Sequence, residues 1–306
     1  MSTTATGTYP CDNSSLTNFK AWGTPISAAF SAFGWTQTSD TGQINWSTIG
    51  AVPSNAYPYE VWKAADAAAS TTPIYVKIGY GYSTTAVGIQ ITVGTGSNGS
   101  GTITGIISGY SNVSIVTGSF GTTTLANQGA TLYNSFFSGT AGEMRMLLWV
   151  GSTAAGVQNI FAIERSKDSS GNPTTAYFSV LYASDTNLAF AQRQQSVLTS
   201  GATPGFETGI ISFGPTAGTG TGSFNGTVAA YPVFPLIGSI GNPMLGMMSA
   251  AALDVANGTT VTVSTLYGST HTYIACKSLS GFTNGIGGIG TLSIGGVKMA
   301  VLMRYE

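Results

Sequence analysis

The chain has 306 residues, of which only 7% are Asp, Glu, Lys or Arg, against roughly 25% in an average soluble domain. Its formal net charge of -1 excludes the basic stripe that a nucleic-acid-binding surface needs, so we expect no nucleic-acid partner. With so little charge, copies of the chain repel each other weakly, and neutral polar side chains or neighbouring subunits must cover the surface.

Residues 1–19 are predicted to form an extended N-terminal arm, and residues 20–306 a β-rich body that could comprise two subdomains. The polar start of the arm lacks the basic and apolar stretches of a signal peptide. No apolar run in the chain reaches the ~18 residues of a membrane span. We therefore expect synthesis in the cytoplasm and no insertion into a membrane.

One short helix is predicted after the arm. Thr24 suits the N-cap, Pro25 the first helical position, and Gly34 the stop after the last turn. Trp22 and Trp35 flank this segment. One face carries apolar residues at spacings of three and four: Ile26, Ala29, Phe30 and Phe33. We expect the helix to plug one end of a β structure.

From about residue 43 the pattern changes to strands. Residues 58–63 (PYEVWK) and 73–80 (PIYVKIGY) are rich in aromatic and β-branched side chains. Residues 88–93 alternate apolar and polar side chains with the period of two that is typical of a strand. A glycine-rich stretch then breaks the chain.

The clearest hairpin lies near the middle of the chain. Residues 158–165 and 175–183 flank a polar turn with Gly and Pro, and residues 143–150 could be a neighbouring strand. Asn257-Gly258 indicates a second tight turn, and residues 297–305 a last strand. The whole predicts an all-β fold, a sandwich or barrel-like antiparallel body with one short N-terminal helix.

Two glycine-rich segments, residues 94–99 and 285–290, match the GxGxxG pattern of dinucleotide-binding proteins. That pattern works at the start of a helix, where the glycines let the backbone approach a pyrophosphate. Neither segment opens a plausible helix, and 42 glycines make chance matches common. We expect no nucleotide and no other cofactor.

His271 is the only histidine, so a catalytic triad or a metal site of the usual kind would have to use it. Paired carboxylates would suit a glycan-cleaving enzyme, and Glu143 and Glu164 lie in predicted strands that also carry Arg145 and Arg165. Ion pairs across strands explain these four residues equally well. The other candidate carboxylates are Asp40, Glu60, Asp66, Asp168, Asp185, Glu207 and Asp254. We expect no enzyme and no metal.

Aromatic residues make up 11% of the chain. If exposed on one face they could stack on the sugars of a host surface; packing in the core or at subunit interfaces is the favoured alternative. The candidates for glycan or subunit contact are Trp46, Tyr59, Trp62, Tyr80 and Tyr82. Cys11 and Cys276 are too few for a disulfide scaffold, and whether they pair with each other stays open.

Five segments are distinctive in combination. Residues 33–46 read FGWTQTSDTGQINW, residues 59–66 YEVWKAAD, and residues 73–78 PIYVKI. Residues 90–101 read QITVGTGSNGSG, and residues 302–306 LMRYE. Together they resemble a family of uncharacterised virion structural proteins encoded in tailed bacteriophages and prophages. The resemblance runs from about residue 19 to the terminus.

The resemblance implies a place in the virus particle and supplies no catalytic residues. We expect a homo-oligomer, a trimer or a hexamer, that contacts other virion proteins in the tail, the baseplate or a tail fibre. A capsid decoration protein and a carbohydrate-binding host-recognition protein are the alternatives.

Overall fold

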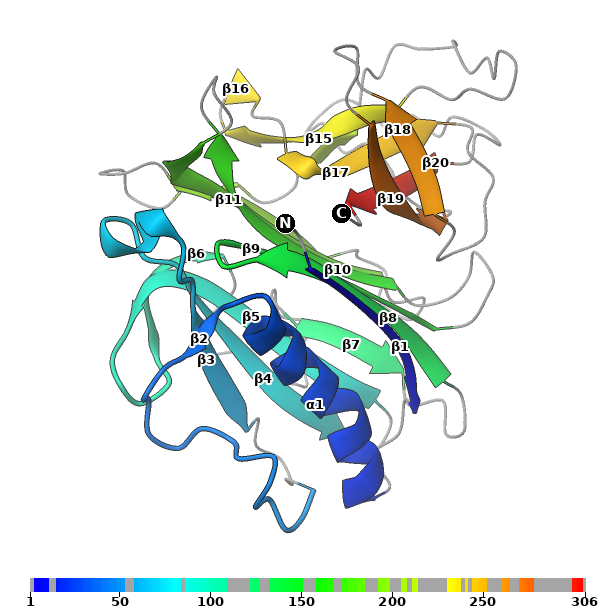
Figure 1. Ribbon diagram of the computed structural model, residues 1–306. Coiled ribbons are helices and arrows are strands. Elements are labelled where there is room, and N and C mark those ends of the chain that lie inside the picture. The colour runs from blue at the N-terminus through cyan, green and yellow to red at the C-terminus, as the bar shows by residue number, and fades with distance from the viewer. Residues whose placement is uncertain are drawn as a thin grey trace.

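Three antiparallel β-sheets and one helix form the protein, seen here in a computed structural model (Figure 1). The predicted all-β class with one N-terminal helix is confirmed, and among the described strands no sheet closes into a barrel. The sheets lie in three layers, with the central sheet between the other two. The structure describes residues 3–10, 15–52, 58–83, 86–108, 122–126, 132–150, 158–167, 172–184, 192–198, 205–207, 211–213, 230–237, 240–241, 244–251, 260–264, 270–277 and 299–304.

The N-terminal sheet has the strand order β2-β3-β4-β5-β6, with β7 pairing to β5. The strands predicted at residues 58–63, 73–80 and 88–93 are confirmed as β3, β4 and β5, and a 3-10 turn, η1, joins β3 to β4. The bounds are β2 Thr36–Gln37, β3 Tyr59–Lys63, η1 Ala67–Ser70, β4 Tyr75–Ser83, β5 Ala86–Ser97, β6 Ile103–Ser108 and β7 Thr122–Ala126.

The central sheet has the order β1-β8-β9-β10-β11-β12-β13. The predicted hairpin is confirmed, since β10 pairs antiparallel with β11 on one side and with β9 on the other. Within the predicted arm, β1 pairs along its whole length with β8 and forms the first strand of this sheet. The bounds are β1 Thr3–Pro10, β8 Leu132–Thr140, β9 Glu143–Val150, β10 Gln158–Lys167, β11 Pro173–Ser184, β12 Gln192–Leu198 and β13 Gly205–Glu207.

The C-terminal sheet has the order β14-β15-β17-β20-β19-β18, with β16 pairing to β15. The predicted last strand is confirmed as β20, while the Asn257-Gly258 turn lies outside the described residues. The bounds are β14 Ile211–Phe213, β15 Ala230–Ile237, β16 Ile240–Gly241, β17 Met244–Ala251, β18 Thr260–Ser264, β19 Thr270–Lys277 and β20 Met299–Arg304.

The predicted start of the helix is wrong, because α1 spans Leu16–Ala32. Its N-cap is Ser15, whose Oγ accepts a hydrogen bond from the N–H of Asn18 at 3.1 Å. Thr24, the predicted cap, lies inside the helix and donates its hydroxyl to the Lys20 carbonyl at 2.6 Å. Pro25 is likewise internal. Trp22 lies inside the helix and does not flank it.

The predicted stop at Gly34 is confirmed, and the helix ends there in a Schellman motif. Gly34 adopts a left-handed φ of 89°, which a residue without Cβ reaches at no steric cost. Its N–H donates to the Ser31 carbonyl, and the Trp35 N–H donates to the Phe30 carbonyl, each at 3.0 Å. The rings of Phe30 and Trp35 meet edge to face at 5.4 Å, which is the apolar contact that accompanies this motif.

The main core lies between the N-terminal sheet, the central sheet and α1, which runs along the N-terminal sheet in Figure 1. The helix also contacts β1 and β2, the first strands of the two sheets. It contributes Phe19, Trp22, Ile26 and Phe30; the N-terminal sheet contributes Trp62, Val76, Ile78, Tyr80, Ile89, Ile91 and Val93; the central sheet contributes Phe137, Met144, Met146, Phe161 and Ile163.

Candidate functional site

Two of the five aromatic candidates are buried in this core. Trp62 is 4% exposed and Tyr80 is 0% exposed. Trp62 stacks on Phe30 with ring centroids 5.4 Å apart, and Tyr80 meets Trp22 at 5.9 Å. Neither ring can stack on a sugar at the surface, so core packing, the favoured alternative, accounts for both.

Trp46 is half-buried and packs against the same core cluster. Its ring lies 5.4 Å from that of Phe19 and meets Tyr80 edge to face at 4.9 Å. A Cβ on Gly23 would lie 2.1 Å from the Trp46 ring, so this close approach to the helix requires glycine. Tyr82 belongs to β4, and its side chain is outside the described residues.

Tyr59 lies on the opposite face of the N-terminal sheet. Its hydroxyl donates to the Thr41 carbonyl at 2.5 Å, and a Cβ on Gly101 would lie 2.2 Å from its ring. Lys77 Nζ is 4.3 Å from the ring centroid. The ring therefore joins the loop after β2 to the turn after β5. Among the candidates whose side chains are described, Trp46, Trp62 and Tyr80 thus pack on the α1 side of the N-terminal sheet, and Tyr59 lies on the other side.

Glu60, between Tyr59 and Val61 on β3, points into the aromatic core and is 1% exposed. Both oxygens accept hydrogen bonds from neutral donors, which come from four different segments. These are Ser27 Oγ at 2.8 Å, Trp46 Nε1 at 3.1 Å, Trp62 Nε1 at 3.4 Å and Tyr80 OH at 2.6 Å. The carboxyl group ties the helix, the loop and two strands together.

Burial raises the pKa of Glu60, and the hydrogen bonds from Tyr80, Ser27, Trp62 and Trp46 offset only part of that rise. In the sequence, Glu60 is one of several carboxylates, and its charge alone does not set it apart. Its position two residues before Trp62 on an alternating strand is the signal that it points inward. Its partners, up to 33 residues away, carried no such signal.

Asp40 organises the loop that follows β2. Its carboxylate accepts hydrogen bonds from Thr38 Oγ1 at 2.6 Å, from the Gly101 N–H at 2.8 Å, and from the Ser97 hydroxyl. Burial by itself raises the pKa of Asp40, but these hydrogen bonds and the charge of Lys77 outweigh it, so the pKa is lowered. Asp40 therefore joins residues 38–40 to the β5–β6 turn.

Gln43 closes the edge of β3 with its side chain. Its Nε2 donates to the Thr38 carbonyl at 2.7 Å, and its Oε1 accepts the Val61 N–H at 2.7 Å. The Thr38 N–H donates to the Val61 carbonyl, and the Ile44 N–H to the Tyr59 carbonyl, each at 2.9 Å. Backbone groups that an edge strand would leave open are thus paired within the chain.

The carboxylates Glu143 and Glu164 share one arginine on the central sheet. Arg145 Nη2 lies 2.7 Å from Glu143 Oε2 and 3.1 Å from Glu164 Oε2. The predicted ion pair across strands is confirmed for Arg145 of β9 with Glu164 of β10, whereas Glu143 pairs with Arg145 within β9. Burial lowers the pKa of Arg145, but its attraction to Glu164 and Glu143 more than reverses this, and the pKa is raised. The cluster faces away from the main core, near Tyr273 of the C-terminal sheet.

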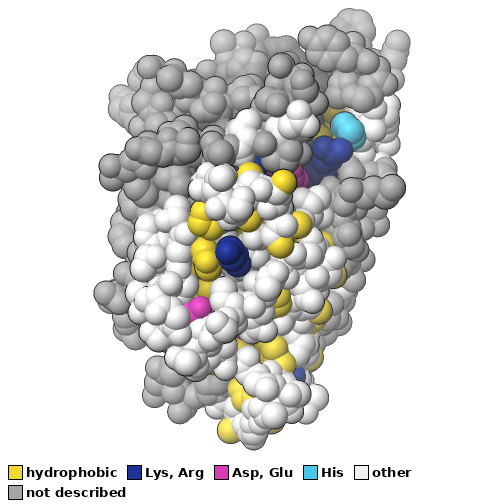
Figure 2. Space-filling model, turned by 60° about the vertical axis from the view of Figure 1, so that its left-hand side comes forward, with side chains coloured by type: hydrophobic (Ala, Val, Ile, Leu, Met, Phe, Trp, Pro, Cys, Tyr) yellow, Lys and Arg dark blue, Asp and Glu magenta, His cyan; other side chains and the backbone are white. Residues whose placement is uncertain are grey.

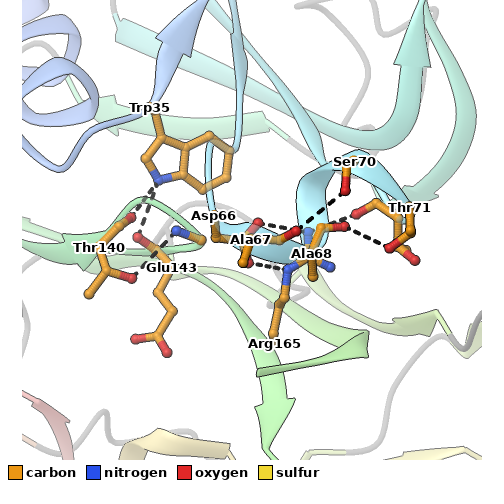
Figure 3. Close-up of polar contacts among 11 residues, drawn as sticks. Trp35, Asp66, Ala67, Ala68, Ser70, Thr71, Thr140, Glu143 and Arg165 are labelled. Atoms are coloured by element: carbon orange, nitrogen blue, oxygen red, sulfur yellow. Dashed lines mark hydrogen bonds and ion pairs between the residues drawn. The ribbon is translucent and has the colours of Figure 1, made fainter. Parts of the chain in front are cut away.

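Arg165 projects to the other face of the central sheet and pairs with Asp66, just before η1. Arg165 Nη2 lies 3.0 Å from Asp66 Oδ1, and it donates to the Thr72 carbonyl at 2.7 Å. Figure 3 shows Asp66 and Arg165 facing each other beside the turn. Nearby, Trp35 Nε1 donates a hydrogen bond to the Thr140 carbonyl. The pair anchors the β3–β4 connection to β10.

His271, at the start of β19, lies beside Arg304 of β20, with 3.2 Å between His271 Nδ1 and Arg304 Nη2. A guanidinium only donates, so Nδ1 accepts and the imidazole is neutral in this contact. Within the described part of the chain, no group of three or more His, Cys, Asp or Glu side chains could hold a metal ion. Cys276 lies in β19, and Cys11 is outside the described residues.

The first GxGxxG segment lies in β5 and the turn after it, a β-hairpin in which no helix follows. The second lies outside the described residues. Over the residues that the structure describes, no helix is long and apolar enough to cross a membrane. No family model, curated protein sequence or solved structure matches the chain.

Proposed function

We propose that the chain is a non-enzymatic structural component of a tailed bacteriophage particle, a homo-oligomeric protein of the tail, the baseplate or a tail fibre. The observation that carries the proposal is where the few charges lie. The chain has 10 Lys and Arg and 11 Asp and Glu residues. Among the charged side chains that the structure describes, six are buried: Asp40, Glu60, Glu143, Arg145, Glu164 and Arg165.

Because these charged side chains are buried, fewer charges remain on the surface, and copies of the chain repel each other weakly. A free protein with such a surface tends to associate, whereas a subunit of a permanent assembly makes use of that tendency. Closed symmetry then limits the assembly to a defined ring or trimer. The charge distribution therefore favours a building block over a dispersed enzyme.

The segments that resemble phage virion proteins also support the proposal, because three of them meet in space. Asp40 from the first segment accepts the Gly101 N–H from the β5–β6 turn, and Gln43 accepts the Val61 N–H on β3. Trp46 reaches Glu60. These residues stabilise the fold, which is the role expected of family-wide features in a structural protein.

The absence of catalysis is part of the proposal. Glu143 and Glu164, the carboxylates that suited a hydrolase, are held by one arginine, and His271 contacts Arg304. A capsid decoration protein remains the second candidate, since the same charge argument applies to it.

The test is immunogold labelling of intact particles of the encoding phage or prophage, viewed by negative-stain electron microscopy. An antibody against the recombinant chain is expected to place gold on the tail or its tip. Gold over the whole head would replace the tail assignment with capsid decoration. Particles without label, and without peptides of the chain in their mass spectrum, would contradict the proposal.

Light scattering after size-exclusion chromatography tests the oligomer separately. We expect the recombinant chain to elute at the mass of three or six copies of its 31.2 kDa. A monomer at micromolar concentration would contradict the homo-oligomer without removing the chain from the particle.

A further inference from the structure

Two tyrosines and two lysines alternate on the outer face of the N-terminal sheet, the face turned away from α1. We name this set the Tyr–Lys face: Tyr59 and Lys63 of β3 with Tyr75 and Lys77 of β4. The register places Lys63 opposite Tyr75 and Lys77 opposite Val61, so all four project from one side. Each of the four is half-buried, with part of its surface open.

Each lysine lies over a tyrosine ring. Lys77 Nζ is 4.3 Å from the ring centroid of Tyr59, and Lys63 Nζ is 5.6 Å from that of Tyr75. Diagonal positions on neighbouring strands lie within about 8 Å of each other. The two lysines, at diagonal positions of β3 and β4, therefore project from the same face, each with its ammonium group over a tyrosine ring.

The described carboxylates do not neutralise this face by pairing with it. Ion pairs in the described part of the chain use arginine only, and Asp40 acts on Lys77 through its charge while its oxygens accept other hydrogen bonds. Figure 2 shows, on the side brought forward from the left of Figure 1, a basic side chain among hydrophobic ones with acidic side chains scarce.

We propose that the Tyr–Lys face binds an acidic polysaccharide. Its carboxylate groups pair with Lys63 and Lys77, and an adjoining sugar ring packs beside Tyr75. Within the described residues, the carboxylates that a second copy of this chain would offer are buried or already paired: Asp40, Glu60, Asp66, Glu143 and Glu164. The inference rests on the proposed function, since an outer particle protein meets the polysaccharides of a host surface.

The test uses the purified full chain in affinity electrophoresis through gels that contain polygalacturonate, hyaluronate or polysialic acid, with neutral dextran as reference. We expect retardation by at least one acidic polymer and none by dextran. Lys63→Gln should weaken binding about fivefold, as for loss of one charged contact. Lys77→Gln should weaken it less, because Lys77 is partly desolvated and lies near Asp40.

Lys20→Gln is the matched control, since Lys20 is a half-buried lysine of α1 that lies off the Tyr–Lys face. It should bind as the unmodified chain does. Equal weakening by all three substitutions, equal retardation by single-stranded DNA, or no retardation by any of the acidic polysaccharides would overturn the proposal. Circular dichroism of each variant confirms that the fold is intact.

The two proposals fail separately. A chain that labels the tail with gold but ignores all acidic polysaccharides keeps its place in the particle and loses this binding face. Specific binding by a chain that is absent from particles would keep the face and remove the virion role.

Discussion

Buried carboxylates occur in two regions of this protein, and the regions satisfy them differently. Glu60, in the core beneath α1, receives hydrogen bonds from two indoles and two hydroxyls. Glu143 and Glu164, on the other face of the central sheet, are bound by Arg145. Neutral donors leave a carboxyl group free to titrate, whereas an arginine between two carboxylates makes the charge of each depend on the others.

The comparison shows how a chain poor in charge distributes it. The Arg145 cluster uses three charges to neutralise each other, and removing the arginine takes away the cation that two buried carboxylates share. The Glu60 site uses one charge and distributes its hydrogen bonds over four segments. Losing one donor there leaves three. A substitution in the Arg145 cluster should therefore lower the free energy of unfolding more than a substitution at the Glu60 site.

The largest effect is expected from Arg145→Met, which leaves two carboxylates buried without their cation. Breaking a buried ion pair in this way costs roughly 3–5 kcal/mol, so the urea midpoint should fall strongly at neutral pH. The triple variant Glu143→Gln, Arg145→Met, Glu164→Gln should recover much of that loss. Equal midpoints for the single and triple variants would show that charge is not the cause.

Gly23→Ala tests the close packing of the Trp46 ring against α1, beside Glu60. The new Cβ would lie 2.1 Å from the Trp46 ring, and overpacking of up to ~3 kcal/mol exceeds the ~1 kcal/mol that alanine gains in a helix. We expect a loss of about 2 kcal/mol and altered tryptophan fluorescence. Gly50→Ala is the control, because nothing lies within 4 Å of its Cβ. A change below about 0.5 kcal/mol is expected there.

Glu60→Gln should cost only about 1 kcal/mol, because one indole N–H then faces the amide NH2 group, which cannot accept a hydrogen bond from it. The pH dependence should change as well. A raised pKa in the fold means that Glu60 contributes stability below its ordinary pKa and loses it as pH rises through the folded value. Urea midpoints measured from pH 4 to pH 8 should therefore fall less steeply in the variant. An unchanged slope would contradict the raised pKa.

Asp40→Asn should have the smallest effect, below about 1 kcal/mol at neutral pH, and its pH dependence should have the opposite sign. The pKa of Asp40 is lowered in the fold, so its contribution is present above the ordinary pKa and disappears as pH falls through the folded value. Thermal unfolding between pH 2 and pH 5 should show a shallower acid limb in the variant. A steeper limb would mean that Asp40 is not held in its charged form.

The β-strands and the end of the helix were predictable because their signals are local. Aromatic and β-branched side chains identified β3 and β4, a period-two pattern identified β5, and Gly34 followed the apolar face of the helix. The start of the helix was missed, since Thr24-Pro25 is a stronger local signal than Ser15. The turns between Leu16 and Gly23 are held by burial of Phe19 and Trp22, which are 0% exposed, and that packing depends on distant strands.

The candidate site followed the same division. Arg145 and its two glutamates lie on neighbouring strands of one predicted sheet, so their pairing could be anticipated. Arg165 was predicted to do the same, but it pairs with Asp66, 99 residues away in sequence. The grouping of Tyr80 with Tyr59 failed for a simpler reason: odd and even positions of paired strands point to opposite faces, which clusters of aromatic letters do not reveal.

The Gln43 side chain affects whether the N-terminal sheet can pair with strands of other chains. A sheet with an unpaired edge strand can add a strand from another chain, which leads to aggregation where chains are crowded. Gln43 accepts the Val61 N–H from within its own chain. This N–H on the edge of β3 is therefore not available to pair with a strand of another chain. A second copy that approached this edge would contact it through side chains and would not extend the sheet by strand pairing.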